Sequence, residues 1–226
     1  MKVAIVGATG MVGQSFIKVL EEYKLPIEEI TFLASKRSAG KTIQFNGKDY
    51  VVEELTEHSF DKGIDYALFS AGGDTSKEFA PIAASKGCIV IDNSSAWRMD
   101  TTVPLVVPEV NPEALKNHHN IIANPNCSTI QCMLPLNALK PFGIKRVVYS
   151  TYQAVAGSGY KGVQNLKDNL EGKPSTFYPT QILHNVIPQI DVFLENGNTK
   201  EEEKMINETR KILSLPNLPV SATCVR

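Results

Sequence analysis

Length, composition and charge already exclude several classes of protein. The chain has 226 residues, a formal net charge of −1, and 42% hydrophobic and 21% charged residues, which suits a globular protein of one large or two modest domains. The balanced charge gives no basic field for nucleic acid, and no uncharged apolar run approaches the roughly 20 residues that span a membrane. Four scattered cysteines favour free thiols in a cytoplasmic protein, and no Cys/His grouping has metal-site spacing.

A glycine-rich turn follows the first predicted strand. Residues 3–6 are apolar and rich in β-branched side chains, which predicts a buried parallel strand. Gly7, Gly10 and Gly13 follow at once and lead into an amphipathic helix. This order is a variant of the dinucleotide-binding fingerprint, in which glycines let the backbone approach a pyrophosphate at the helix N-terminus. A tight structural turn is the alternative interpretation.

The loop after the second predicted strand, residues 30–34, is basic. A site that prefers NAD usually has an acid near this position, which binds the ribose 2′-OH. Here Arg37 and Ser38 lie in a loop with two lysines and no acid. A guanidinium and a hydroxyl would bind a 2′-phosphate, which a carboxylate would repel. The loop therefore predicts NADP, and a solvated basic loop is the alternative.

Strands and helices alternate through the rest of the first half. We expect a hairpin at 42–54 around Asn46-Gly47 and a helix at 75–86. Three further strands are expected at 66–70, 88–92 and 121–123. This alternation predicts an α/β fold with a doubly wound parallel sheet of the Rossmann type. Arg98 follows one of the strands and suits phosphate binding, but a surface salt bridge explains it equally well.

Cys127 lies in the stretch Asn-Pro-Asn-Cys-Ser-Thr, between an apolar run and a helical segment that begins at Ser128. A thiol at the start of a helix meets free N–H groups and the positive end of the helix dipole. Both favour the thiolate, which is the nucleophilic form. The alternative is a small buried residue, as most lone cysteines are.

The second half is predicted to mix helices and strands. The expected segments are a helix after Cys127, a strand at 145–153, a turn at 154–159, a helix at 160–171, an irregular stretch at 178–194, a charged helix at 198–213 and a strand at 219–226. Glu201 and Lys204 share a face of the charged helix. Spacing alone favours an exposed ion pair there.

Eight motifs together resemble aspartate-semialdehyde dehydrogenase of the bacterial type: GATGMVG, SKRSAGK, SAGG, IDNSSAWRMD, NPNCSTIQ, TYQAVAGSG, EEEKM and SATCVR. The resemblance implies an NADP-binding domain at 1–125 and an α+β catalytic and dimerisation domain at 126–226. It implies NADPH-dependent reduction of L-aspartyl 4-phosphate to L-aspartate 4-semialdehyde and phosphate, by a homodimer. That step leads to lysine, methionine, threonine and diaminopimelate.

The resemblance also implies residue roles. Cys127 matches the nucleophile that forms an acyl-thioester. Gln153 matches a substrate-binding residue, and Arg98 and Lys204 match phosphate ligands. Glu201 matches the acid that binds the amino group, and Arg226 matches the arginine that binds the carboxylate. The matching cofactor contacts are Gly7, Thr9, Gly10, Met11, Val12, Arg37, Ser38, Ala156 and Gly157.

One family feature has no match. The family's general base is a histidine a few residues beyond the arginine that matches Arg226, and this sequence stops before that position. We therefore expect a truncated second domain, belonging to a longer enzyme. A non-catalytic nucleotide-binding fragment and a related acyl-phosphate reductase remain as alternatives.

Overall fold

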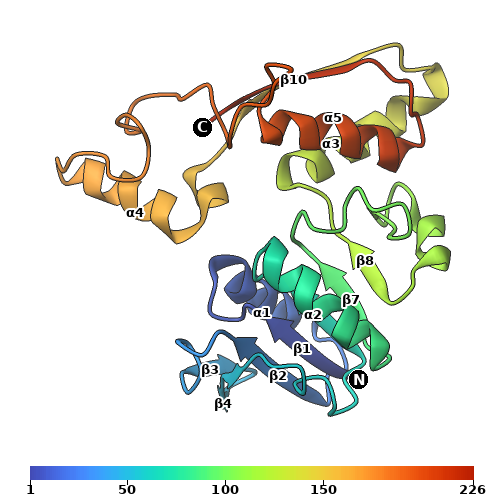
Figure 1. Cartoon of the computed structure of the whole chain (residues 1–226), viewed down its shortest axis with the longest axis vertical. Coiled ribbons are helices and arrows are strands. Elements are labelled where there is room, and N and C mark those ends of the chain that lie inside the picture. The colour runs from blue at the N-terminus through green and yellow to red at the C-terminus, as the bar shows by residue number, and fades with distance from the viewer. The chain divides into compact units, whose positions relative to one another are not determined.

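The computed structural model describes all 226 residues and divides into two compact units, Met1–Pro125 and Asn126–Arg226. Figure 1 shows the first unit in blue to green and the second in yellow to red. No helix in the chain is both long enough and apolar enough to cross a membrane.

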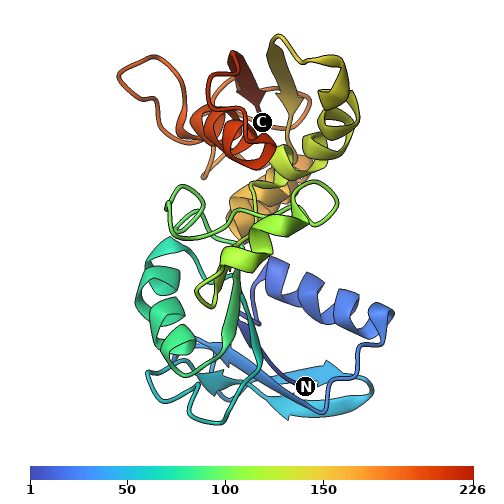
Figure 2. The same ribbon diagram turned by 90° about the vertical axis from the view of Figure 1, so that its right-hand side faces the viewer.

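The first unit is built on a six-stranded parallel sheet, which confirms the predicted Rossmann-type fold. The strands lie in the order β5 (Glu53–Glu54), β2 (Glu29–Ala34), β1 (Lys2–Val6), β6 (Tyr66–Phe69), β7 (Ile89–Asp92) and β8 (Ile121–Ala123). Helix α1 (Met11–Tyr23) joins β1 to β2, and α2 (Gly73–Ser85) joins β6 to β7 in the opposite direction. Right-handed crossovers therefore place the two helices on opposite faces (Figure 2). The order reverses between β1 and β6, where such sheets bind ligands.

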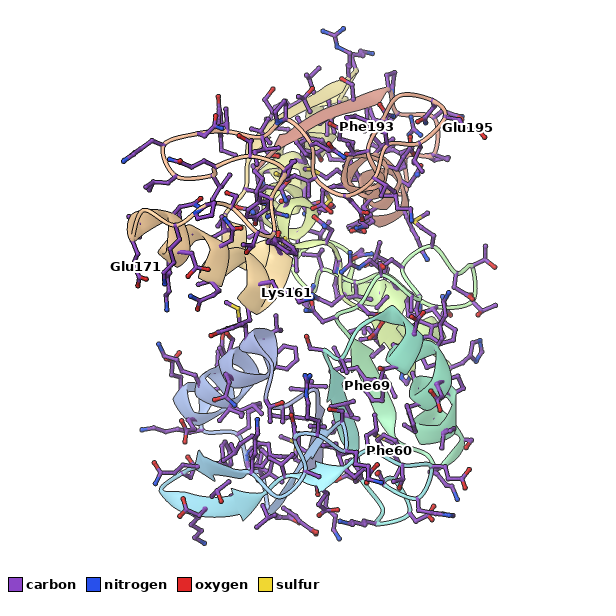
Figure 3. All side chains as sticks on the ribbon, turned by 60° about the vertical axis from the view of Figure 1, so that its left-hand side comes forward. Phe60, Phe69, Lys161, Glu171, Phe193 and Glu195 are labelled. Carbon is purple, nitrogen blue, oxygen red and sulfur yellow. The ribbon has the colours of Figure 1, made fainter.

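Apolar packing joins a hairpin to strand β2. The Asn46-Gly47 pair has positive φ angles of 48° and 74°, so β3 (Thr42–Phe45) and β4 (Lys48–Val51) form the expected antiparallel hairpin. Its Phe45 ring meets Phe32 of β2 edge to face at 6.4 Å. Farther along, Phe60 stacks on Phe69 with centroids 6.0 Å apart (Figure 3). A short 3-10 helix, η1 (Pro112–Asn117), precedes β8.

The second unit pairs two parallel strands with helices. In chain order it contains α3 (Cys127–Leu139), η2 (Lys140–Phe142), β9 (Val147–Tyr152), η3 (Val155–Ser158), α4 (Gly159–Leu170), α5 (Lys200–Leu213) and β10 (Val220–Val225). Strand β9 alternates between buried residues and exposed ones such as Val148 and Tyr152. On the buried side, the Tyr149 hydroxyl lies 2.8 Å from Thr209 Oγ1 of α5.

Helix α5 differs from its expected character. Its start is a capping box between Thr199 and Glu202, and its apolar face buries Met205, Ile212 and Leu213. Glu201 is also buried, with only 6% of its surface exposed. The Glu201–Lys204 ion pair that the spacing predicts is present at 3.3 Å, but its expected exposure was wrong, because Glu201 lies on the face of the helix that packs inside the second unit.

Candidate active site

The turn after β1 approaches its neighbours so closely that only glycine fits. Gly7 has φ +85°, and a Cβ there would lie 2.4 Å from the Ser70 carbonyl oxygen. A Cβ on Gly13 would lie 2.3 Å from the Gly7 carbonyl oxygen. Gly10 is the N-cap of α1 and supplies no side chain to its first N–H groups. The turn therefore leaves an open helix N-terminus of the kind that binds pyrophosphate.

A cavity of about 440 Å³ opens over this turn in the first unit. Its lining includes five of the expected cofactor contacts: Gly7, Thr9, Gly10, Arg37 and Ser38. Met11 and Val12 are the first residues of α1, each 40% exposed, and do not line the cavity. The glycine turn and the open N-terminus of α1 beside this cavity are features of a dinucleotide-binding site.

The cavity wall beyond β2 has a cation and no acid. Arg37 is exposed, whereas Ser38 is buried in the turn that follows Ala34. Glu54 pairs with Ala34 across the edge of the sheet, but Leu55, not Glu54, lines the cavity. The lining therefore offers a guanidinium where an NAD-preferring site would offer a carboxylate.

Arg98 lies in the first unit and is buried, with 7% of its surface exposed. Its Nε donates to the Asn124 carbonyl oxygen at 2.9 Å, and its Nη2 donates to the Asn93 carbonyl oxygen at 3.0 Å. These bonds connect the loop after β7 to the residue that follows β8.

Cys127 is the first residue of α3, one position earlier than the helix start expected from the sequence. Its N-cap is Asn126, whose Oδ1 accepts the N–H groups of Ser128 and Thr129 at 2.9 and 3.3 Å. Cys127 is exposed. Burial raises the pKa of the other three thiols, to about 12 for Cys88 and by a smaller amount for Cys132 and Cys224. Cys127 is thus the thiol best placed to react.

Asn126 connects the Cys127 turn to helix α5. Its N–H donates to Glu208 Oε2 at 2.6 Å, and its Nδ2 donates to Glu201 Oε1 at 2.9 Å. Asn126 and Glu208 were not found from the sequence. An Asn before Ser-Thr is an N-cap signal that could have indicated the first, but no local pattern indicates the second.

Glu201 brings three of the expected site residues together. Its Oε1 accepts from Gln153 Nε2 at 3.0 Å, and its Oε2 accepts from Lys204 Nζ at 3.3 Å. Burial acts to raise the pKa of this carboxyl, but hydrogen bonds from Gln153 and Asn126 and the charge of Lys204 outweigh it. The pKa therefore lies below its ordinary value, and Glu201 is a carboxylate at neutral pH.

A second cavity, of about 430 Å³, opens beside Cys127 within the second unit. Cys127, Gln153, Gly157 and Arg226 all line it. The Arg226 Nη1 donates to the Ala154 carbonyl oxygen at 2.6 Å. Glu201, which bonds to Gln153 and Lys204, does not line the cavity, and neither does Lys204. Ala156 is exposed on η3 and does not line it either. A thiol and a guanidinium thus face one space large enough for a small anionic substrate.

Family models and related sequences both match this chain to semialdehyde dehydrogenases. The semialdehyde dehydrogenase NAD-binding domain matches residues 2–118, and the semialdehyde dehydrogenase dimerisation domain matches residues 133–226. The chain is 58% identical over 238 aligned residues to an aspartate-semialdehyde dehydrogenase of Aquifex aeolicus, and 49% identical over 240 to that of Bacillus subtilis. Each alignment covers 100% of this chain and 69% of the relative.

Solved structures agree. The crystal structure of aspartate semialdehyde dehydrogenase II from Vibrio cholerae matches with a TM-score of 0.94 at 48% identity, over 100% of this chain and 70% of that one. The same enzyme complexed with ASA matches with a TM-score of 0.91 at 49% identity, over 100% and 69% of the two chains.

Proposed function

This chain belongs to the aspartate-semialdehyde dehydrogenase family, a family of oxidoreductases in amino-acid biosynthesis, and we propose that it reduces L-aspartyl 4-phosphate to L-aspartate 4-semialdehyde and phosphate with NADPH. The product would serve the synthesis of lysine, methionine, threonine and diaminopimelate. The observation that supports this most is the exposed Cys127 at the N-terminus of α3, in one cavity with Arg226 and Gln153. Four unpaired cysteines support a cytoplasmic location.

Cys127 is the proposed nucleophile. Its sulfur attacks the acyl carbon of the substrate, a carbon–sulfur bond forms, and the bond to the phosphate oxygen breaks with its electron pair leaving on phosphate. The product of this half-reaction is a thioester on Cys127. Asn126 Oδ1 already accepts the N–H groups of Ser128 and Thr129, so the backbone N–H of Cys127 is the donor proposed for the oxyanion that forms on the way.

Charged residues divide the recognition of the substrate. Arg226 would bind the carboxylate, and Arg98 and Lys204 would bind the phosphate, since guanidinium and ammonium groups suit such anions. Glu201 would bind the amino group. Glu201 is buried outside the cavity lining but bonds to Gln153, which lines the cavity, so this role requires the amino group to reach Glu201 beside Gln153.

The cavity over the Gly7 turn would hold the cofactor. Gly7, Thr9, Gly10, Met11 and Val12 supply the pyrophosphate cradle, and the loop residues Arg37 and Ser38 supply the contacts to a 2′-phosphate. Ala156 and Gly157 would contact the cofactor from the second unit. A bound nicotinamide cofactor supplies the hydride that releases the aldehyde.

A homodimer is the proposed assembly. The dimerisation-domain match covers the second unit, and the outward face of β9 exposes Val148 by 59% and Tyr152 by 83%. Exposed apolar residues on one face of a sheet are typical of an interface.

Acylation of Cys127 tests the proposed chemistry on this chain directly. Mixing the protein with L-aspartyl 4-phosphate should add one aspartyl group to Cys127 and release one equivalent of phosphate, as read by intact and peptide mass spectrometry. Cys127→Ser should give neither product, whereas Cys132→Ser should give both. Absence of the adduct from the unmodified protein would refute the nucleophile, and retained NADPH binding would then indicate a nucleotide-binding module alone.

A further inference from the structure

The turn at residues 154–158 holds the Arg226 guanidinium. The Ala154 carbonyl accepts from Nη1, and a Cβ on Gly157 would lie 2.6 Å from the same nitrogen. The backbone of this turn therefore determines where the guanidinium sits beside Cys127. No side chain caps the N-terminus of η3 or of α4, the two helices that this turn contains or leads into.

Two buried amides on α4 hold the loop of residues 173–182, which folds back along the helix (Figures 1 and 3). Asn165 Oδ1 accepts the N–H groups of Thr176 and Phe177 at 2.9 and 2.7 Å. Asn169 Oδ1 accepts the N–H of Ile182 at 3.1 Å. Asn165 is only 1% exposed and Asn169 only 5%. Buried amides with this many partners fix a loop in one conformation.

Tyr178 extends from this fixed loop to the 154–158 turn that holds Arg226. Its hydroxyl donates to Ser158 Oγ at 2.9 Å. Gly162 makes room for the contact, since a Cβ there would lie 2.6 Å from the Tyr178 hydroxyl and 2.6 Å from the Val155 carbonyl oxygen. A continuous series of contacts thus connects Asn165 through Tyr178 and Ser158 to the turn that holds Arg226.

We propose that Tyr178 is a positioning residue for substrate recognition: held by Asn165, it fixes the 154–158 turn and so aims the Arg226 guanidinium at the substrate's carboxylate. This deepens the proposed function and rests on it. Tyr178 does not line the cavity beside Cys127. Its loss should weaken recognition of the carboxylate specifically and leave the reactivity of the thiol unchanged.

Competition against alkylation tests the proposal on the whole chain. Iodoacetamide labels Cys127, and L-aspartate 4-semialdehyde protects it by adding reversibly to the sulfur: the carbonyl carbon bonds to sulfur, and the carbonyl oxygen takes a proton. 3-Aminopropanal is the same aldehyde without the carboxylate. The ratio of the two protection constants measures the carboxylate preference.

The expected result is a preference that depends on the Tyr178 hydroxyl. Tyr178→Phe should weaken protection by the semialdehyde roughly five-fold, the value of one neutral hydrogen bond, with protection by 3-aminopropanal and labelling without ligand unchanged. Ser158→Ala removes the acceptor of the Tyr178 hydroxyl and should cause the same selective loss of protection by the semialdehyde. Tyr160→Phe, which removes a hydroxyl bonded to Gln164 on the exposed side of α4, should match the unmodified protein.

Combination with Arg226→Ala separates positioning from general support of the fold. Arg226→Ala should abolish the preference, and adding Tyr178→Phe should then cost nothing further, since coupled residues are not additive. An equal five-fold loss in both backgrounds, or an equal loss for both aldehydes, would overturn the positioning role. An unmodified protein without any carboxylate preference would overturn the proposed function as well. A preference that survives both Tyr178→Phe and Ser158→Ala would overturn the positioning role alone.

Discussion

Alanine at Gly7 should destabilise the first unit more than alanine at any glycine that only needs a positive φ. Two separate costs apply at Gly7. Its φ of +85° is unfavourable for a residue with a Cβ, and the added carbon would lie 2.4 Å from the Ser70 carbonyl oxygen and 2.7 Å from its carbon. Those atoms are backbone of the segment that follows β6, so they cannot swing away as a side chain would.

The magnitude follows from the two costs. Left-handed backbone costs a non-glycine residue about 1–2 kcal/mol, partly offset by about 0.4–1 kcal/mol from the stiffer unfolded chain. Overpacking against fixed atoms adds about 1–3 kcal/mol. Gly7→Ala should therefore lower the free energy of unfolding by about 1–4.5 kcal/mol, a shift of roughly 5- to 2,000-fold in the unfolding equilibrium.

Two matched variants separate the costs. Gly63→Ala has a similar φ of +70° with no atom within 4 Å of the new Cβ, so it should show the backbone cost alone. Gly13→Ala has no positive φ but a Cβ 2.3 Å from the Gly7 carbonyl oxygen, so it should show the steric cost, less the roughly 0.5–1 kcal/mol that alanine gains over glycine inside helix α1.

Trp97 provides the assay. It is the single tryptophan of the chain and lies in the first unit, where its Nε1 donates to Ser76 Oγ at 2.9 Å. Urea unfolding followed by its fluorescence thus reports on this unit. If Gly7→Ala and Gly63→Ala gave the same free energy of unfolding, the close approach of the two backbone segments would not be what requires glycine.

Three further predictions concern charge and reactivity. Arg37→Ala should weaken binding of NADPH far more than binding of NADH in a fluorescence titration; equal losses would exclude Arg37 from recognition of the 2′-phosphate. The lowered pKa of Glu201 stabilises the folded state above its ordinary value of 4.5 and loses this effect as the pH falls through the folded pKa. The difference in urea midpoint between the unmodified protein and Glu201→Gln should therefore shrink from about pH 6 to about pH 3, and a constant difference would contradict the assignment. Iodoacetamide at neutral pH should label Cys127 before the three thiols whose pKa burial raises, as peptide mapping would show.

Local sequence patterns were sufficient for most of the fold. The Gly7 turn, the Asn46-Gly47 hairpin and the alternation of strands with helices each depend on residues within a few positions, and the structure contains all three. Cys127 at a helix start was visible for the same reason. The helix begins one residue earlier than expected because Asn126 caps it.

The interior of the second unit was not predictable from local patterns. Spacing along the helix pairs Glu201 with Lys204, three residues away, and favours an exposed ion pair, whereas Asn126, which binds Glu201 in the interior, is 75 residues away. Asn126 and Glu208 are 82 residues apart. Burial of an acid depends on such distant partners, and spacing along one helix contains no information about them.

The attachment of Asn126 to α5 has a consequence for synthesis of the protein. The acids that hold this turn follow it in the chain by 75 and 82 residues. At roughly 5–20 residues per second, a ribosome needs about 4–16 s to make that intervening length. For those seconds the nascent polypeptide already has its reactive sulfhydryl but lacks the anchors that orient it. The Cys127 turn can therefore take its final orientation only after Glu208 has been made.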